Sequence, residues 1–291
     1  MSSVEDYELL DSGEFQKLER FGPIVLRRPC AQALWPPQLQ PRQWQGATAS
    51  FQRRQQQQQW QDRHQLPESW IVQVAGIRFE LRSTDFGHLG IFPEQRSSWL
   101  QIRELCRQFA HRHGRPARTL NLFAYSGGSS LAAAQGGSEV CHVDASKGMV
   151  QWARENAAHN QLQNAPIRWI VDDVMRFLKR EERRERLYDL IILDPPSYGR
   201  GAQGEIFKIE EHLGPLLAQL ANLISAEPIG VLLSCHTPEF TGLSLNHLLA
   251  HHFGPEGQRS HGELLLEGAP KVRPVPSGHF CWWLGKGNSL P

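Results

Sequence analysis

The sequence predicts an α/β protein with a Rossmann-like, doubly wound, mainly parallel seven-stranded sheet and a small strand-rich N-terminal domain. Three observations predict this fold. From residue 115 onward, short aliphatic runs alternate with helical patterns of roughly 10–15 residues, which is typical of βαβ units. Near the C-terminus, two strand-like runs at 262–268 and 279–285 predict an antiparallel edge. Before residue 96, the apolar runs are short and separated by turn residues.

The first predicted part, residues 1–95, is expected to contain strands and turns over 6–29 and a hairpin over 70–81 around Ala75-Gly76. A Pro/Gln-rich insert around residues 36–66, which includes RRQQQQQWQ, is expected to be a long loop that adds nothing to the core. A connecting helix is predicted over 96–114, because apolar residues recur there with helical spacing.

The remaining part, residues 115–291, is predicted to be the sheet domain. Its parallel strands are expected at 119–125, 140–146, 167–173, 189–196 and 230–235. Its helices are expected from about residue 129 and over 148–160, 174–185, 212–224 and 243–252.

The composition excludes several classes of protein. The 31 basic and 30 acidic residues leave no overall field that would attract a polyanion. There is no apolar run that could span a bilayer or act as a secretion signal, so a cytoplasmic location is expected. The five cysteines are scattered and never spaced as Cys-x-x-Cys, so neither a disulfide framework nor a metal site is predicted.

Residues 20–63 are locally basic, with seven arginines, one acidic residue and five interleaved Phe or Trp residues. Two interpretations remain open for this segment. It is suited to phosphate contact with base stacking, or its rings pack on the domain itself.

Polar and glycine residues follow the predicted strands, and ligands bind at the carboxyl ends of such strands. Gly127 and Gly128 follow the first strand, and Asp144 comes 17 residues after Gly127 at the end of the second. The third strand ends in Asp172-Asp173. A carboxylate at Asp144 suits the two hydroxyls of a ribose, and an aspartate after the third strand suits an adenine amino group. Together these features predict an adenosine ligand.

The adenosine ligand is predicted to be S-adenosylmethionine. A dinucleotide site needs Gly-x-Gly-x-x-Gly, but residues 129–131 are Ser-Ser-Leu. The fourth strand ends in Asp194-Pro195-Pro196, where two prolines stiffen the chain, followed by Ser197 and Tyr198. Such a carboxylate and rigid carbonyl groups can hold the edge of a base while Tyr198 packs against it.

The run LNLFAYSGG, with VCHVDASKGMVQWARENAAHN, VDDVMRFL, DLIILDPPSYGRG and VLLSCH, resembles the class I S-adenosylmethionine-dependent ribosomal RNA methyltransferases. The resemblance is strongest to the large-subunit cytosine-C5 methyltransferases, and it covers about residues 86–235 and continues into the C-terminal strands. It implies a cofactor site made of Asn121, Phe123, Ala124, Ser126, Gly127, Gly128, Asp144, Ala145, Ser146, Asp172 and Asp173. It also brings in Phe92 and Gln95 through the segment GHLGIFPEQR, and it implies that Pro195, Pro196 and Tyr198 bind substrate.

The resemblance implies catalytic roles for Asp194 and Cys235. A thiolate that adds to carbon 6 of cytosine activates carbon 5 toward the methyl group, while Asp194 would hold ring nitrogen 3. The alternative is that Cys235 is a small buried residue, as most free cysteines are. His236 follows it where the resembling enzymes more often carry Ser or Gly.

The predicted function is thus methylation of a nucleobase in RNA, with ribosomal RNA as the expected partner and cytosine C5 as the expected acceptor. Methylation of a ring or exocyclic nitrogen, with Cys235 idle, is the first alternative. A non-catalytic RNA-binding protein with a vestigial cofactor fold and a nicotinamide oxidoreductase are the others. No RNA-binding PUA domain is recognisable in residues 1–67, and the oligomeric state stays open, with a homodimer among the alternatives.

Overall fold

The computed structural model describes residues 5–54, 57–200 and 204–291. The chain forms two compact units, one made of residues 1–96 with 265–277 and the other of residues 97–264 with 278–291. Most of the predicted connecting helix therefore clusters with the sheet domain. The segment 265–277, assigned by sequence to that domain, clusters with the N-terminal region.

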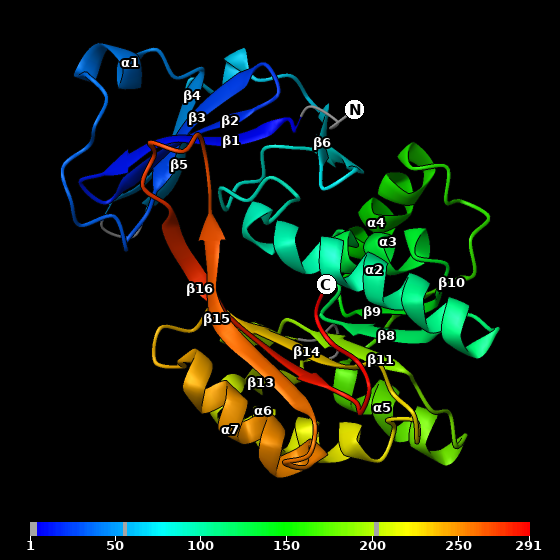
Figure 1. Ribbon diagram of the computed structural model, residues 1–291. Coiled ribbons are helices and arrows are strands. Elements are labelled where there is room, and N and C mark those ends of the chain that lie inside the picture. The colour runs from blue at the N-terminus through cyan, green and yellow to red at the C-terminus, as the bar shows by residue number, and fades with distance from the viewer. Residues whose placement is uncertain (1–4, 55–56, 201–203) are drawn as a thin grey trace. The chain divides into compact units, whose positions relative to one another are not determined.

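The first unit contains a five-stranded sheet and a separate hairpin, as expected for a strand-rich region (Figure 1). The sheet order is β1 (Tyr7–Gly13), β2 (Gln16–Phe21), β3 (Ile24–Pro29), β4 (Ala49–Arg54) and β5 (Gln57–Gln61). Only the β3–β4 pair of this sheet is parallel. The hairpin is made of β6 (Trp70–Val74) and β7 (Ile77–Leu81), joined by Ala75-Gly76 at positive φ.

The Pro/Gln-rich insert contributes to the core of this unit, so its prediction as a loop outside the core was wrong. It forms α1 (Pro41–Gln45) and the strands β4 and β5. Trp44, Phe51 and Trp60 are each at most 9% exposed. The buried Asp11 carboxylate accepts a hydrogen bond from the Trp44 indole at 3.0 Å, and Phe51 pairs with Trp60 across the strands. A few large rings can bury enough surface to order a polar segment. These rings pack on their own domain.

The second unit is built on a seven-stranded sheet, which confirms the predicted fold (Figure 1). Its order is β10 (Ile167–Val171), β9 (Glu139–Asp144), β8 (Arg118–Leu122), β11 (Leu190–Leu193), β14 (Gly230–Cys235), β16 (Val275–Leu284) and β15 (Gln258–Leu266). The five strands from β10 to β14 are parallel, and β16 is antiparallel to β14.

Helices cover both faces of this sheet (Figure 1). On one face lie α2 (Arg96–His113), α3 (Gly128–Gln135) and α4 (Lys147–His159), and on the other α5 (Val174–Arg183), α6 (Ile209–Ala221) and α7 (Gly242–Phe253). A short hairpin of β12 (Tyr198–Arg200) and β13 (Ile206–Lys208), which the sequence pattern did not predict, precedes α6. None of the helices in the described residues is long and apolar enough to cross a membrane.

The strand register brings the ends of the parallel strands to a single edge. Leu122 at the end of β8 pairs with Val143 on one side and Leu193 on the other. Because β8 lies between β9 and β11, the loop after β8 lies between Asp144 and Asp194. The chain also changes direction across the sheet here, with β9 and β10 on one side of β8 and β11 and β14 on the other. This reversal of strand order is where open α/β sheets bind ligands.

Candidate active site

The loop between β8 and α3 has an unusual backbone conformation. Phe123 and Tyr125 have positive φ angles of 54° and 49°, and Gly127, the N-cap of α3, has φ 95°. Left-handed backbone costs non-glycine residues about 1–3 kcal/mol each, and such strain is often found at functional sites. The loop is held by hydrogen bonds from the Ala124 amide to Val143 O (3.1 Å) and from the Gly127 amide to Ala124 O (3.0 Å).

Both glycines of this loop allow close packing. A Cβ on Gly127 would lie 3.0 Å from Cβ of Ala153 on α4, and a Cβ on Gly128 would lie 2.7 Å from the Trp99 ring of α2. These contacts bring two helices against the start of α3. A side chain at either position would push the loop away from its place at the sheet edge.

A buried polar network braces the loop from below. The Asn121 amide donates to Ser130 Oγ at 2.9 Å, and Ser130 Oγ is 2.9 Å from Nδ1 of His142, the neighbour of Asn121 on β9. Burial, followed by the charge of Arg154, lowers the pKa of His142 to about 3, so its ring is neutral. Asn121 was predicted to line the cofactor, but its amide is used to hold the start of α3. Sequence reasoning missed Ser130 and His142, because nothing in the sequence shows which strands are neighbours.

One further contact fixes the loop. The predicted ligand residue Ser126 is buried, and its carbonyl accepts a hydrogen bond from the Asn156 amide at 2.9 Å. Asn156 lies on α4 and was not singled out from sequence. Loop and helix are therefore joined through a buried amide, which is a structural role for both residues.

Asp144, at the end of β9, is held by backbone donors. Its Oδ2 accepts from the Tyr125 amide at 2.9 Å and its Oδ1 from the Ser146 amide at 2.8 Å. Burial raises the pKa of Asp144, and these two hydrogen bonds oppose that shift. Among the described residues, no basic side chain forms an ion pair with it. Each oxygen accepts one hydrogen bond and keeps further acceptor capacity, so the carboxylate is oriented to receive hydroxyl groups.

The residues next to Asp144 start α4. Ala145 is half-buried, and Ser146 is the N-cap, its Oγ accepting from the Met149 amide at 3.4 Å. Ser146 thus contributes its backbone amide to Asp144 and its side chain to the helix.

Asp172 and Asp173 follow β10, and both carboxylates have partners within the protein. Asp173 caps α5, its Oδ1 accepting from the Arg176 amide at 2.9 Å. Asp172 accepts from the Asp173 amide at 2.9 Å and pairs with the Arg180 guanidinium. The Asp172 amide donates to Asp144 O at 3.1 Å, which places this turn beside Asp144. An adenine amino group would therefore share Asp172 with Arg180.

The segment after β11 carries the predicted acceptor residues. Pro195 is buried and Pro196 exposed, and Ser197 Oγ is 2.6 Å from the Thr237 hydroxyl, which ties this segment to the end of β14. Tyr198 is 51% exposed and accepts a hydrogen bond from Arg200 at 3.0 Å.

The β12–β13 hairpin is anchored to the loop after β8. Phe207 of β13 lies 5.1 Å, centroid to centroid, from Phe123 of that loop. Tyr198 stands on the opposite strand of the same hairpin, where it pairs with Lys208. The hairpin that carries Tyr198 is thus attached to the strained loop through the Phe123–Phe207 contact.

Cys235, at the end of β14, is fully buried. Burial raises the pKa of its thiol, hydrogen bonds from Thr237 lower it, and the charge of Asp194 raises it further. Burial and Asp194 outweigh Thr237, so the neutral form of the thiol is favoured, which is the wrong form for a nucleophile. The next residue, His236, has its Nε2 3.5 Å from Asp194 Oδ1.

Phe92 and Gln95 belong to the first compact unit. Phe92 is half-buried, with its ring 5.7 Å from His88, and Gln95 is buried in a short 3₁₀ turn. Their predicted role at the cofactor remains a prediction.

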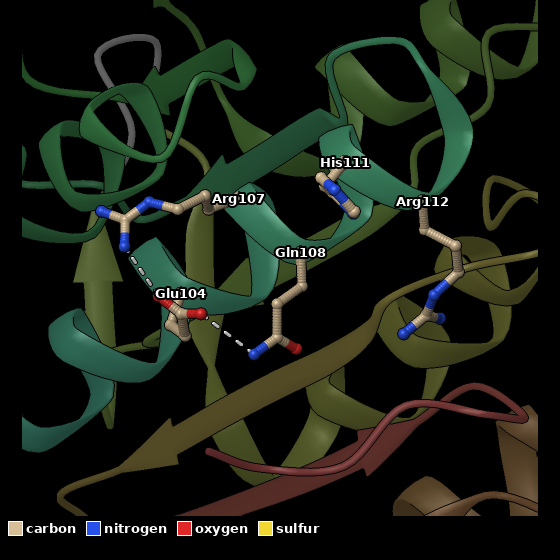
Figure 2. A pocket seen from close by; sticks show the side chains of 5 residues that line it. All are labelled: Glu104, Arg107, Gln108, His111 and Arg112. Atoms are coloured by element: carbon tan, nitrogen blue, oxygen red, sulfur yellow. Dashed lines mark hydrogen bonds and ion pairs between the residues drawn. The ribbon is translucent and has the colours of Figure 1, made fainter.

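A shallow hollow of about 660 Å³ lies elsewhere, on α2, lined by Glu104, Arg107, Gln108, His111 and Arg112 (Figure 2). Arg107 and Gln108 both donate to Glu104, at 2.8 and 3.0 Å. These residues come from one helix, and none of the predicted site residues is among them, so this hollow is separate from the strand ends.

The chain closely resembles proteins of one family. The family model for S-adenosylmethionine-dependent methyltransferases matches residues 25–251. A crystal structure of a SAM-dependent methyltransferase from Agrobacterium tumefaciens is 37% identical, with a TM-score of 0.91 over 98% of this chain and 92% of that one. The chain belongs to the S-adenosylmethionine-dependent methyltransferase family. Its cofactor is S-adenosylmethionine, and the nicotinamide and non-catalytic alternatives are set aside.

More distant comparisons concern the fold and parts of the chain. The crystal structure of SMU.776 with S-adenosylhomocysteine has the same fold, with a TM-score of 0.71 at 20% identity over 97% of this chain and 75% of that one. Ribosomal RNA large subunit methyltransferase K/L from Shewanella baltica is 32% identical over 157 residues, or 53% of this chain and 21% of that protein. The protein of the same name from Pseudoalteromonas translucida is 30% identical over 165 residues, 56% of this chain and 22% of that protein. The matched region spans about a fifth of these relatives.

The residues of this methyltransferase fit its cofactor. Asp144 is oriented for two hydroxyl donors, and the glycine loop presents backbone close to the same place. When bound, S-adenosylmethionine supplies an electrophilic methyl group. Asp144 and the loop 123–128 would hold its nucleoside, and Asp194, beyond that loop along the edge, would face the methyl acceptor.

Proposed function

We propose that this methyltransferase modifies a nucleobase in RNA, of the ribosomal class, in the cytoplasm, and that the methyl acceptor is a ring or exocyclic nitrogen. The substrate class is supported by the names of the partial relatives, which are large-subunit ribosomal RNA methyltransferases. The observation that carries the proposal is the placement of Asp144 and Asp194 on either side of the β8 loop, at one sheet edge.

The acceptor is proposed from the chemistry of Asp194. An ionised carboxylate accepts hydrogen bonds and cannot donate them. Asp194 therefore suits a base edge that offers an N–H group, such as an exocyclic amine. As such a nitrogen gains the methyl group it gives up one proton, which an oxygen of Asp194 can accept. The carbonyls of the stiff Pro195-Pro196 segment offer further acceptors next to it.

Carbon 5 of cytosine is the second candidate, because Cys235 ends β14 close enough to Asp194 for that charge to affect its thiol. This route is supported less well. It needs a thiolate, whereas burial and Asp194 raise the pKa of Cys235. It also needs a protonated Asp194, because ring nitrogen 3 of cytosine is a hydrogen-bond acceptor. Both requirements run against the charges of the site.

The test is methyl transfer from labelled S-adenosylmethionine to ribosomal RNA, followed by mass spectrometry of the nucleosides. We expect an N-methylated nucleoside and a Cys235→Ala variant with activity within about threefold of the parent protein. A 5-methylcytidine product, together with loss of turnover in Cys235→Ala, would establish the carbon-5 route instead. Cys281→Ala is a matched control, since Cys281 is also buried, on the neighbouring strand β16.

A further inference from the structure

We propose that His236 is a positioning residue that orients the Asp194 carboxylate toward the methyl-accepting nitrogen. The inference rests on the proposed function, and it names a residue outside the Asp-Pro-Pro motif. His236 directly follows Cys235, and its Nε2 lies 3.5 Å from Asp194 Oδ1. The two side chains are 34% and 28% exposed, so the pair stands at the surface of the sheet edge and within reach of a substrate.

The backbone around the pair is held in place on both sides. The Ser197–Thr237 hydrogen bond joins the residues that follow Asp194 and His236, at 2.6 Å. The strands themselves are paired up to Leu193 and Leu233. The two side chains therefore extend from neighbouring strand ends whose separation is fixed, so their contact does not depend on a mobile loop.

Strand β16, which pairs with β14, leaves room for the His236 imidazole. Gly278, at the edge of the β14–β16 pairing, has φ 128°, and a Cβ there would lie 2.8 Å from His236 Nδ1 and 2.8 Å from Cys235 O. A side chain at this position would strike the imidazole. The ring thus fits between Asp194 on one side and a glycine backbone on the other.

The chemical consequence concerns the orientation of the carboxylate. The imidazole, with its Nε2 3.5 Å from Oδ1, lies beside the carboxylate and limits how that group can turn relative to the base. Orientation of this kind matters, because a displacement of about 1 Å at a reacting group can cost about 100-fold in rate. His236 therefore acts through Asp194 and has no need to contact the substrate.

A matched pair of variants tests this role. His236→Leu removes the polar nitrogen beside Asp194 and keeps much of the volume, whereas His236→Gln keeps a polar N–H group at a similar reach. We expect Leu to lower kcat by about 10–100-fold, as a misplaced reacting group would. The KM for RNA and the affinity for S-adenosylmethionine should stay within about threefold, and Gln should recover most of kcat. A general loss of structure would lower all of these quantities together and would not distinguish Leu from Gln.

The controls separate this inference from the function on which it rests. His251→Leu, at an exposed position of α7, should leave kcat unchanged. If His236→Leu does not fold, His236→Ser replaces it, since a serine hydroxyl is too short to reach Asp194. Wild-type kcat in the Leu or Ser variant, or an equal loss in Gln and Leu, would overturn the role of His236 alone. A parent protein that methylates no RNA nitrogen would overturn the proposed function and this inference with it.

Discussion

The two halves of the sheet edge are held by different means. In the half proposed to bind the cofactor (the cofactor half), Asp144 is oriented by two backbone amides, and the loop after β8 is held by the buried Asn121–Ser130–His142 network. In the half proposed to bind the methyl acceptor (the acceptor half), side chains contact one another: His236 lies beside Asp194, and Ser197 contacts Thr237. Backbone donors fix a site regardless of neighbouring side chains, whereas side-chain pairs change with single substitutions. The cofactor half is therefore suited to an invariant ligand, and the acceptor half to a specific one.

The largest expected effect is in the acceptor half. Asp194→Asn removes the negative charge that we propose accepts the departing proton, so kcat should fall by about 10²–10⁴-fold, the usual range for a general base. Calorimetry should show S-adenosylmethionine binding within about threefold of the parent protein. Equal losses of binding and kcat would show that the two halves are not separate.

In the cofactor half, a substitution is expected to lower the affinity for S-adenosylmethionine and to change kcat little. Asp144→Asn replaces one carboxylate oxygen by an amide that repels the Tyr125 or Ser146 amide proton, and it removes the charge-assisted bonds that we propose Asp144 makes to the cofactor hydroxyls. At about 1.5–3 kcal/mol for a hydrogen bond to a charged group, the affinity for S-adenosylmethionine should fall by about 10–150-fold. Measured at saturating cofactor, kcat should change far less. Unchanged affinity would contradict the assignment of Asp144.

The packing of the glycine loop can be tested with a matched pair of alanine substitutions. Gly128→Ala places a Cβ 2.7 Å from the Trp99 ring, and overpacking of this kind costs about 1–3 kcal/mol of unfolding free energy. Gly148 lies in the first turn of α4, and the atom nearest to a Cβ added there is Ser146 Oγ, at 3.8 Å. Alanine at this position should therefore favour the helix, by up to about 1 kcal/mol. In denaturant unfolding, the free energy of unfolding should be lower than that of the parent protein for Gly128→Ala and higher for Gly148→Ala. A lower free energy of unfolding in both variants would contradict the inference that close packing at Gly128 is what requires a glycine there.

The last effect concerns pH, and at pH 7 it vanishes. Burial lowers the pKa of His142 to about 3, so the folded protein keeps it neutral while the unfolded chain takes up a proton below about 6.5. Stability should therefore fall as the pH drops from about 6.5 toward 3, by up to about 1.4 kcal/mol per pH unit from this residue. His142→Asn should flatten that part of the stability curve, even if it lowers stability at pH 7. An unaltered slope would mean that other groups govern acid unfolding.

The sequence predicted the parallel sheet because the spacing of apolar residues and the length of each apolar run distinguish its strands from its helices. It also placed Asp144, Asp172 and Asp194 at strand ends, since the strands end visibly in polar residues. It missed the β12–β13 hairpin, where three-residue strands leave little pattern. It misjudged the insert, because the burial of Trp44 depends on partners such as Asp11, which lies 33 residues away in the chain.

The amino-acid sequence by itself determined the fold class, the cofactor and the polar residues at the strand ends, because these depend on local patterns and short motifs. The tertiary structure alone decided which partners within the protein those residues have. It turned Asn121 toward Ser130, gave Asp172 an arginine partner, buried the Cys235 thiol and brought His236 to Asp194. The physical reason is strand order. Neighbours in the sheet are distant in the chain, and the charge and direction of a side chain are set by those neighbours.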